Sequence, residues 1–465
     1  MQLIRRICIS SIIHCFTGSS LLYLDHKINL EVKIMGILFI LLLTLMESTL
    51  LYLSLHGKRN FEEERGILNF SILLLLVLFF LTGVFTWSFR FMPITLLVAL
   101  KSLVSLVGLL RRREKSFRKG KTILKAAVSL LLYITAASVL ILFPPYLQPE
   151  VTGTFEVKTE KYTWIDEDRK DAFSTEDSRR LTVELYYPET SEGNYPLVVF
   201  SHGAFGFSGS NYSTFAELAS HGYVVASIGH TGHAFYTLDT SGTLTTVDPD
   251  FISKAAEING ITDTQHEAEI FETTQSWLKL RVEDEHFVLE RILEEASSAE
   301  KGTVFSLIDC ENIGLMGHSL GGATSAEIGR LRPDIDAVIV LDGTMLGEEE
   351  RFENGSVVLD STPYPVPLLN IYAEDHYRNA LTLEENTYSN FYASARALDA
   401  YETVFEDTGH LNFTDLPLFS PILAKALGVG DADSRECINT MNQVVLDFFD
   451  SCLKGEGRPI IKKEY

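Results

Sequence analysis

Four long apolar runs in the first 150 residues of this 465-residue chain restrict that part of it to a helical membrane fold. The runs cover about residues 35–55, 67–87, 92–110 and 123–143. Each is roughly 20 residues long, which at about 1.5 Å per residue crosses a hydrocarbon layer of about 30 Å. The stretch 72–80, ILLLLVLFF, has no polar face and does not suit an amphipathic surface helix. We therefore expect an all-α transmembrane bundle over residues 1–147, with a weaker candidate span at 7–24.

Charge divides the chain in the same place. Residues 1–150 carry 17 basic and 8 acidic side chains, whereas the remaining residues carry 22 and 54. The net charge of −23 argues against a nucleic-acid partner, because phosphate binding needs a surplus of Lys and Arg. Cytoplasmic loops concentrate Lys and Arg, and seven such residues lie between the third and fourth runs: Arg111, Arg112, Arg113, Lys115, Arg118, Lys119 and Lys121. We therefore expect a multi-pass protein of the cell membrane, with the lipid bilayer as a partner and everything after the fourth span on the extracytoplasmic side.

The rest of the chain alternates short aliphatic runs with helical stretches. An acidic linker at 166–177 falls within a connecting segment, 148–178, which also holds a first strand, and we expect a catalytic domain over 179–465. Strand-like runs lie at 181–187, 196–201, 223–228, 313–316, 337–341 and 367–372, and helical stretches at 212–220, 264–295, 320–331 and 437–453. This alternation predicts a mostly parallel sheet with helices on both faces.

One motif is typical of a nucleophilic serine. Residues 317–321 read Gly-His-Ser-Leu-Gly, a G-x-S-x-G sequence. A strand-like run precedes it, and small residues that open a helix follow it. That order predicts a nucleophile elbow, a strained turn that presents the hydroxyl of Ser319.

A serine nucleophile needs a base and an orienting carboxylate, which in this fold follow in the order Ser, acid, His. After Ser319 the only histidines are His376 and His410. His410 follows the strand-like run 401–405 and is the predicted base, whereas we expect His376 at the surface. For the acid, the residues leave two places open: Asp342 after one strand, and Glu374 or Asp375 after the next.

Two backbone N–H groups are expected to form the oxyanion hole. One belongs to Leu320, the residue after the nucleophile. The other should come from the loop Ser-His-Gly-Ala-Phe-Gly at 201–206, where we select Ala204. His202 in this loop suits a structural hydrogen bond. The histidines lack metal-ligand spacing, so no metal and no organic cofactor are expected.

Taken together, these motifs resemble the type II platelet-activating factor acetylhydrolases, within the α/β-hydrolases, and are also similar to bacterial dienelactone and polyester hydrolases. The resembling stretches are 196–203, 218–226, 317–324 and 337–343. The resemblance implies an α/β-hydrolase fold, ester chemistry, Asp342 as the acid and His410 as the base. Two features depart from it: the multi-span region, and Leu320 where the family carries an aromatic residue.

The sequence thus predicts a membrane-anchored serine hydrolase that cleaves carboxylic esters through a Ser319–His410–Asp342 triad. A small-molecule or lipid ester, such as a short-acyl phospholipid, is the expected substrate. Alternatives are an acyltransferase or peptidase with the same triad, or a non-catalytic membrane scaffold or sensor. The sequence leaves the oligomeric state open.

Overall fold

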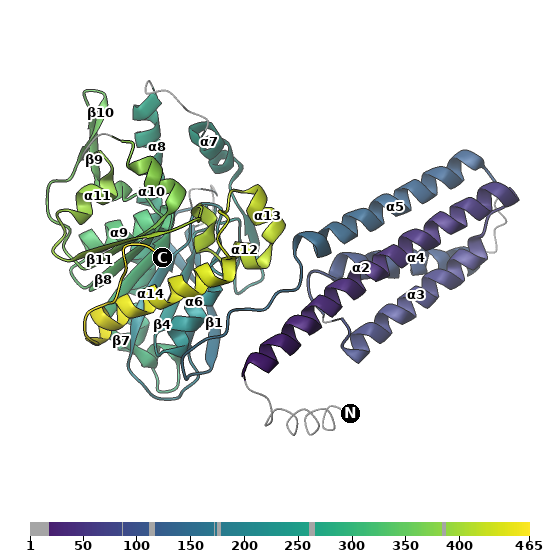
Figure 1. The fold of residues 1–465 in the computed structure, drawn as a ribbon, viewed down its shortest axis with the longest axis horizontal. Helices are drawn as coiled ribbons and strands as arrows, with labels where there is room; N and C mark the ends of the chain where they lie inside the picture. Colours follow the sequence, from purple (N-terminus) through teal and green to yellow (C-terminus); the bar gives the residue numbers. More distant parts are fainter. Residues whose placement is uncertain are drawn as a thin grey trace. The chain divides into compact units, whose positions relative to one another are not determined.

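The computed structural model describes residues 18–85, 87–110, 117–171, 173, 178–259, 266–383 and 387–465. It divides into two compact units (Figure 1): Met1–Leu147 with Leu418–Leu423, and Gln148–Pro417 with Ala424–Tyr465. We describe each unit by itself.

The first unit is built from four long helices: α2 (Gly18–Gly57), α3 (Glu62–Thr82), α4 (Met92–Leu110) and α5 (Lys119–Leu142). The segment Met35–Gly57 of α2 and the other three helices are each long and apolar enough to cross a membrane. Helix α3 starts and ends about five residues before the predicted run 67–87. It ends early because Gly83 closes it in a left-handed conformation with φ 73°. Of the weaker candidate span at 7–24, residues 7–17 lie outside the described part of the chain, and 18–24 belong to α2.

The interior of the helical unit contains charge as well as apolar side chains. Glu47 of α2 is fully buried and pairs with Arg65 of α3 and, at 3.5 Å, with Lys101 of α4. Apolar side chains such as Leu74 and Leu131 face outward. Apolar outside and charged inside is the arrangement expected of helices that meet lipid.

The second unit is centred on an eight-stranded sheet in the order β1-β2-β4-β3-β7-β8-β11-β12. Only β2 runs antiparallel to its neighbours β1 and β4, and the other pairs are parallel. The strands are β1 (Val157–Lys170), β2 (Ser178–Pro188), β3 (Tyr195–Ser201), β4 (Val224–Gly229), β7 (Ile308–His318), β8 (Ala337–Leu341), β11 (Leu368–Ala373) and β12 (Ala400–Phe405). Two hairpins stand apart: β5 (Tyr236–Leu238) with β6 (Leu244–Thr246), and β9 (Glu349–Glu353) with β10 (Ser356–Leu359).

Helices cover both faces of this sheet, as the alternation of runs predicts. The helices that lie wholly in this unit are α6 (Tyr212–Ser220), α7 (Pro249–Asn259), α8 (Glu267–Ser297), α9 (Leu320–Leu331), α10 (Glu374–Ala380), α11 (Ser389–Ser394) and α14 (Ser434–Lys454). The short helices α12 (Leu416–Phe419) and α13 (Pro421–Ala426) are divided between the two units. Successive strand side chains point to opposite faces. Leu197 and Val199 of β3 pack in the core with α8 and α9, whereas Val198 and Phe200 pack in the core with α6 and α14.

The acidic segment 166–177 is not wholly a linker. Asp166 and Lys170 belong to β1 and pair with Arg179 and Ser178 of β2, with a register shift between them. The strand order places β1 at the sheet edge, where the exposed Glu167 and Asp168 stay hydrated and discourage pairing with other chains. Asp166 is buried and pairs with Arg169 at 2.6 Å. Charge therefore does not exclude a strand here.

The parallel strands bring the predicted site residues to one edge of the sheet. β3 ends at Ser201, β7 ends just before Ser319, β8 ends just before Asp342, and β12 precedes His410. Because the carboxyl ends of parallel strands share one edge, the loops that carry these residues meet there.

Candidate active site

Ser319 occupies a sharp turn between β7 and α9. Its φ of 55° and ψ of −124° are strained for a residue with a side chain. Glycines on both sides make the turn sterically feasible. A Cβ at Gly317 would overlap the backbone of Gly321, and a Cβ at Gly321 would overlap the carbonyl of Ser201. The local sequence therefore produces a tight turn against the end of β3, with Ser319 half-buried between buried neighbours, as a nucleophile elbow requires.

His410 and Asp342 are directly hydrogen-bonded. His410 Nδ1 lies 2.6 Å from Asp342 Oδ2, and the Asp342 side chain is buried. Burial opposes ionisation of this carboxyl. However, hydrogen bonds from His376 and His410 outweigh that effect and hold the pKa of Asp342 well below its usual range. Asp342 is therefore a carboxylate aimed at the imidazole.

The alternative acids lie elsewhere. Asp375 Oδ1 accepts the backbone N–H of His376 at 2.7 Å, and Glu374 Oε2 accepts the backbone N–H of Asp407 at 2.7 Å. Within the described residues, neither carboxylate is hydrogen-bonded to His410. The structure thus brings Asp342 to His410, and leaves Glu374 and Asp375 at the start of α10.

His318 positions the loop that carries His410. Its Nε2 donates to the carbonyl of His410 at 2.9 Å, and the two rings lie 4.6 Å apart. Burial lowers the pKa of His318 to about 3, so the ring is neutral at pH 7. The residue between glycine and serine in the motif is thus a structural contact that the sequence analysis did not anticipate.

The loop after β3 approaches the nucleophile closely. A Cβ at Gly203 would come within 3.1 Å of the Ser319 Cβ. In the described part of the chain, neither the N–H of Ala204 nor that of Leu320 donates a hydrogen bond to protein. Two backbone donors without a protein acceptor thus occur on segments beside one serine.

Arg281 of α8 donates hydrogen bonds to the loop that follows β3. The buried guanidinium donates to the carbonyl of His202, and to that of Gly203 at 3.4 Å. A trans peptide points its C=O and N–H in opposite directions. The Gly203 carbonyl also accepts from His202 Nδ1 at 2.7 Å and from the N–H of Gly206 at 3.0 Å, so Arg281 is one of three donors that fix it. The N–H of Ala204 in the same peptide therefore points away from these donors. Burial lowers the pKa of Arg281 to about 9, which still leaves it charged at neutral pH.

A second buried charge lies one turn further along α8. Asp284 pairs with Arg179 at 2.5 Å and with Arg169 at 3.1 Å. It also accepts from His230 Nδ1 at 3.0 Å, and His230 Nε2 lies 2.8 Å from the hydroxyl of Ser201. This network connects α8 to the ends of β2, β3 and β4, and no motif in the sequence pointed to it.

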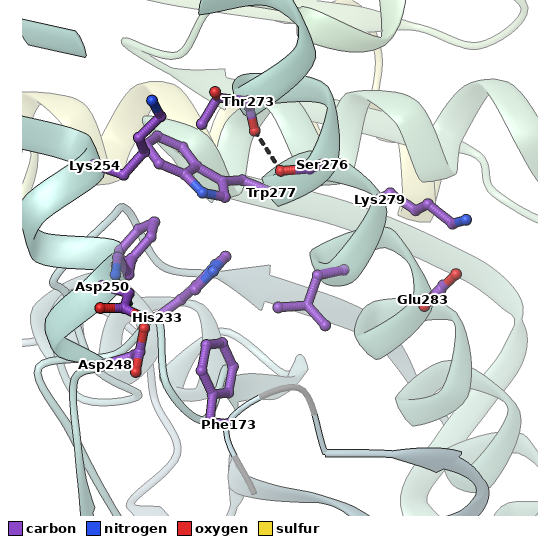
Figure 2. Close-up of a pocket in the computed structure, with 12 residues that line it drawn as sticks. Phe173, His233, Asp248, Asp250, Lys254, Thr273, Ser276, Trp277, Lys279 and Glu283 are labelled. Carbon is purple, nitrogen blue, oxygen red and sulfur yellow. Dashed lines mark hydrogen bonds between the residues drawn. The ribbon is translucent and has the colours of Figure 1, made fainter. Parts of the chain in front are cut away.

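A cavity of about 510 Å³ lies between α7 and α8 (Figure 2). Figure 2 shows Phe173, His233 and Trp277 around the open space, with charged side chains toward its rim. The ring of Phe251 stacks on His233 at 4.0 Å, and the carbonyl of His233 accepts from the N–H of Phe205 at 3.1 Å. The cavity wall is therefore connected to the loop that carries Ala204.

One group of residues could in principle hold a metal ion. The potential ligand atoms of Asp342, His376 and His410 lie within 4.8 Å of one another. Both imidazoles, however, place Nδ1 at hydrogen-bond distance from an Asp342 oxygen. The atoms that would bind a metal already bind each other, so this geometry fits hydrogen bonding. His376 is thus half-buried on Asp342, where the sequence analysis expected a surface residue.

The sheet, its covering helices and the elbow define an α/β-hydrolase fold, as the sequence analysis predicted. The family described as "Platelet-activating factor acetylhydrolase, isoform II" matches residues 177–456, and the chain belongs to this family. The predicted resemblance is therefore confirmed. Residues 1–176, with the four apolar helices, lie outside the match.

Individual relatives are distant. The chain is 24% identical over 304 residues to a platelet-activating factor acetylhydrolase of Bos taurus, a match that covers 57% of this chain and 62% of that protein. A solved structure of a ferulic acid esterase from Streptomyces cinnamoneus superposes with a TM-score of 0.50 at 21% identity. That match covers 67% of this chain and 95% of the esterase and supports the fold.

The Asp284 network generates a stability prediction. Asp284→Asn should lower the thermal unfolding midpoint by about 6 °C or more. It removes the nearer of the two carboxylates that pair with the buried Arg179, with Asp171 remaining at 3.3 Å. We expect a loss of about 3 kcal/mol, and about 2 °C per kcal/mol is expected for a unit of this size. The matched control is Glu283→Gln on the same helix, whose carboxylate is 42% exposed and touches Arg169 at 3.4 Å. Equal midpoints for the two variants would contradict the prediction.

Proposed function

We propose that this protein is a membrane-anchored serine hydrolase that cleaves carboxylic esters. Ser319 is the nucleophile, His410 the base, Asp342 the carboxylate that orients it, and the N–H groups of Ala204 and Leu320 the oxyanion hole. The observation that carries the proposal is the 2.6 Å hydrogen bond from His410 to a buried Asp342, next to a strained serine turn. Membership in the acetylhydrolase family supports the same reaction class.

The mechanism follows from these positions. Ser319 Oγ attacks the ester carbonyl carbon while His410 Nε2 takes its proton. The carbonyl oxygen becomes an oxyanion, which the N–H groups of Ala204 and Leu320 stabilise. Asp342 stabilises the imidazolium. Collapse of the intermediate expels the alcohol, which receives the proton from His410, and water then releases the acid from Ser319 by the same steps.

A lipid ester with a short acyl chain is the proposed substrate class. The support is indirect: the name of the bovine relative, and four helices of membrane-spanning length in the same chain. We further propose that these helices cross the cell membrane and that the catalytic unit lies outside the cytoplasm. The basic residues between the third and fourth helices support that orientation.

The triad is tested by kinetics of the full-length protein in detergent with p-nitrophenyl esters from acetate to laurate. Ser319→Ala and Asp342→Asn should each lower kcat by about 10⁴-fold, because each removes part of one catalytic unit. Asp375→Asn is the matched control and should stay within about threefold of wild type, because its carboxylate contacts a backbone N–H at the start of α10. EDTA should leave the rate unchanged.

A fluorophosphonate should label Ser319 in wild type and not in Ser319→Ala. A folded wild-type protein that neither turns over any ester nor reacts with the probe would favour the non-catalytic scaffold. Transfer of the acyl group to an added alcohol in preference to water would indicate an acyltransferase.

Arg281 generates a separate kinetic prediction. Arg281→Lys should lower kcat by about 10- to 100-fold with a smaller change in KM. The loop then loses the guanidinium contacts to the carbonyls of His202 and Gly203. The Ala204 N–H is held less precisely, and it acts mainly on the transition state. Arg291→Lys is the control on the same helix, since Arg291 pairs only with Glu294 and Glu295 among the described residues. A loss confined to KM, or an equal loss in both variants, would refute the role.

The orientation is tested on intact cells, or on spheroplasts where an outer layer shields the membrane. Externally added protease should remove a C-terminal epitope tag without permeabilisation, because the proposed topology exposes the catalytic unit outside. A tag that is cleaved only after detergent treatment would place that unit in the cytoplasm.

A further inference from the structure

The carboxylate of Asp342 receives two imidazoles, and the proposed mechanism uses only one of them. His410 Nδ1 lies 2.6 Å from Oδ2, whereas His376 Nδ1 lies 3.1 Å from Oδ1. The backbone N–H of Ala373 also donates to Oδ1, at 2.8 Å. Each oxygen of the carboxylate therefore has a fixed partner, and the oxygen opposite His410 is held from α10 and β11.

The surroundings of His376 leave it free to titrate. Its side chain is 30% exposed, and Tyr388 places its hydroxyl 3.4 Å from Nε2. Asp342 faces it from the end of β8 and Asp375 from its own helix. The hydrogen bond to Asp342 raises the pKa of His376, while burial opposes the change.

The other charges on the neighbouring elements are engaged elsewhere. Glu374 and Arg378 of α10 pair with each other, and Glu402 of β12 accepts from the hydroxyl of Tyr372. Asp342 is thus the carboxylate that His376 and His410 share.

We propose that His376 is a positioning residue for His410 that acts through Asp342, and this proposal rests on the function proposed above. In its neutral form His376 donates Nδ1–H to Oδ1 and keeps Oδ2 directed at His410. In its protonated form it adds a positive charge to the same carboxylate, which then stabilises a His410 imidazolium less well. The protonation state of His376 thereby sets how readily His410 gains a proton.

Two imidazoles on one carboxylate titrate as a coupled pair. A proton on His376 repels a second proton on His410, so the base stays unprotonated to lower pH than it would alone. The acid limb of kcat/KM in wild type should therefore extend over two ionisations. Removing the charge at position 376 should leave one ionisation, with its midpoint about half a pH unit or more higher.

The test is the pH dependence of kcat/KM, from about pH 5 to 9, for the full-length protein in detergent with p-nitrophenyl acetate. His376→Asn keeps a side-chain N–H that can reach Oδ1 but carries no charge. Its rate at high pH should stay within about threefold of wild type, and its acid limb should fit a single ionisation at the higher midpoint. His376→Phe removes the donor and should lower kcat about tenfold or more, with KM little changed. His286→Asn, on α8, is the histidine control and should reproduce the wild-type profile.

The outcomes separate the two proposals. A wild-type acid limb retained in His376→Asn would overturn the role of His376, even if Ser319→Ala and Asp342→Asn abolish turnover. Full turnover in those two variants would instead overturn the proposed function. If His376→Phe fails to fold, the pH profile of kcat/KM for His376→Asn still tests the role of His376.

Discussion

The close crossing of three backbone segments at the elbow is the constraint on which the rest of the site depends. Gly321 touches the carbonyl of Ser201, Gly317 touches Gly321, and Gly203 lies against Ser319. The positive φ of Ser319 costs on the order of 1–3 kcal/mol. The ends of the flanking strands, Pro196–Ser201 of β3 and Ile313–His318 of β7, are buried in the sheet and supply enough apolar burial to hold that strain. The strained turn and the loop of Ala204 are therefore set by one packing arrangement.

The buried charges of α8 orient the loop that follows β3. Taking Arg281 and Asp284 out of water costs several kcal/mol each before pairing. An apolar α8 would pack as well, but it would offer no donor to the carbonyls of His202 and Gly203. The guanidinium, together with His202 Nδ1 and the N–H of Gly206, fixes these carbonyls, and in a rigid peptide this turns the N–H of Ala204 the other way. The presence of a buried Arg281 is thus better explained by its effect on the orientation of the loop than by a gain in stability.

Local patterns revealed the strands, the elbow and the order of Ser319 and His410, because each is encoded within a few neighbouring residues. The choice of Asp342 over Asp375 needed the resemblance, since both follow strand ends. The contacts of His376 and His318 depend on how three loops converge, which no local pattern specifies. The α8 network did leave a signal: Arg281, Asp284 and Glu285 share helical spacing with the buried Val288. Charged residues on an apolar face are a sign of buried pairing that periodicity alone overlooks.

Each of the two units contains a buried carboxylate that pairs with two basic side chains from other elements. In the helical unit Glu47 is buried and meets Arg65 and Lys101 from two other helices. In the catalytic unit Asp284 is buried and meets Arg179 and Arg169 from two strands. Apolar contacts tolerate small shifts between elements, whereas a buried carboxylate between two cations has one satisfactory position. In each unit this buried group of charges favours one arrangement of the elements among many that would bury similar apolar area. In the catalytic unit that group lies one helical turn from Arg281, which links the register of α8 directly to the orientation of the Ala204 loop.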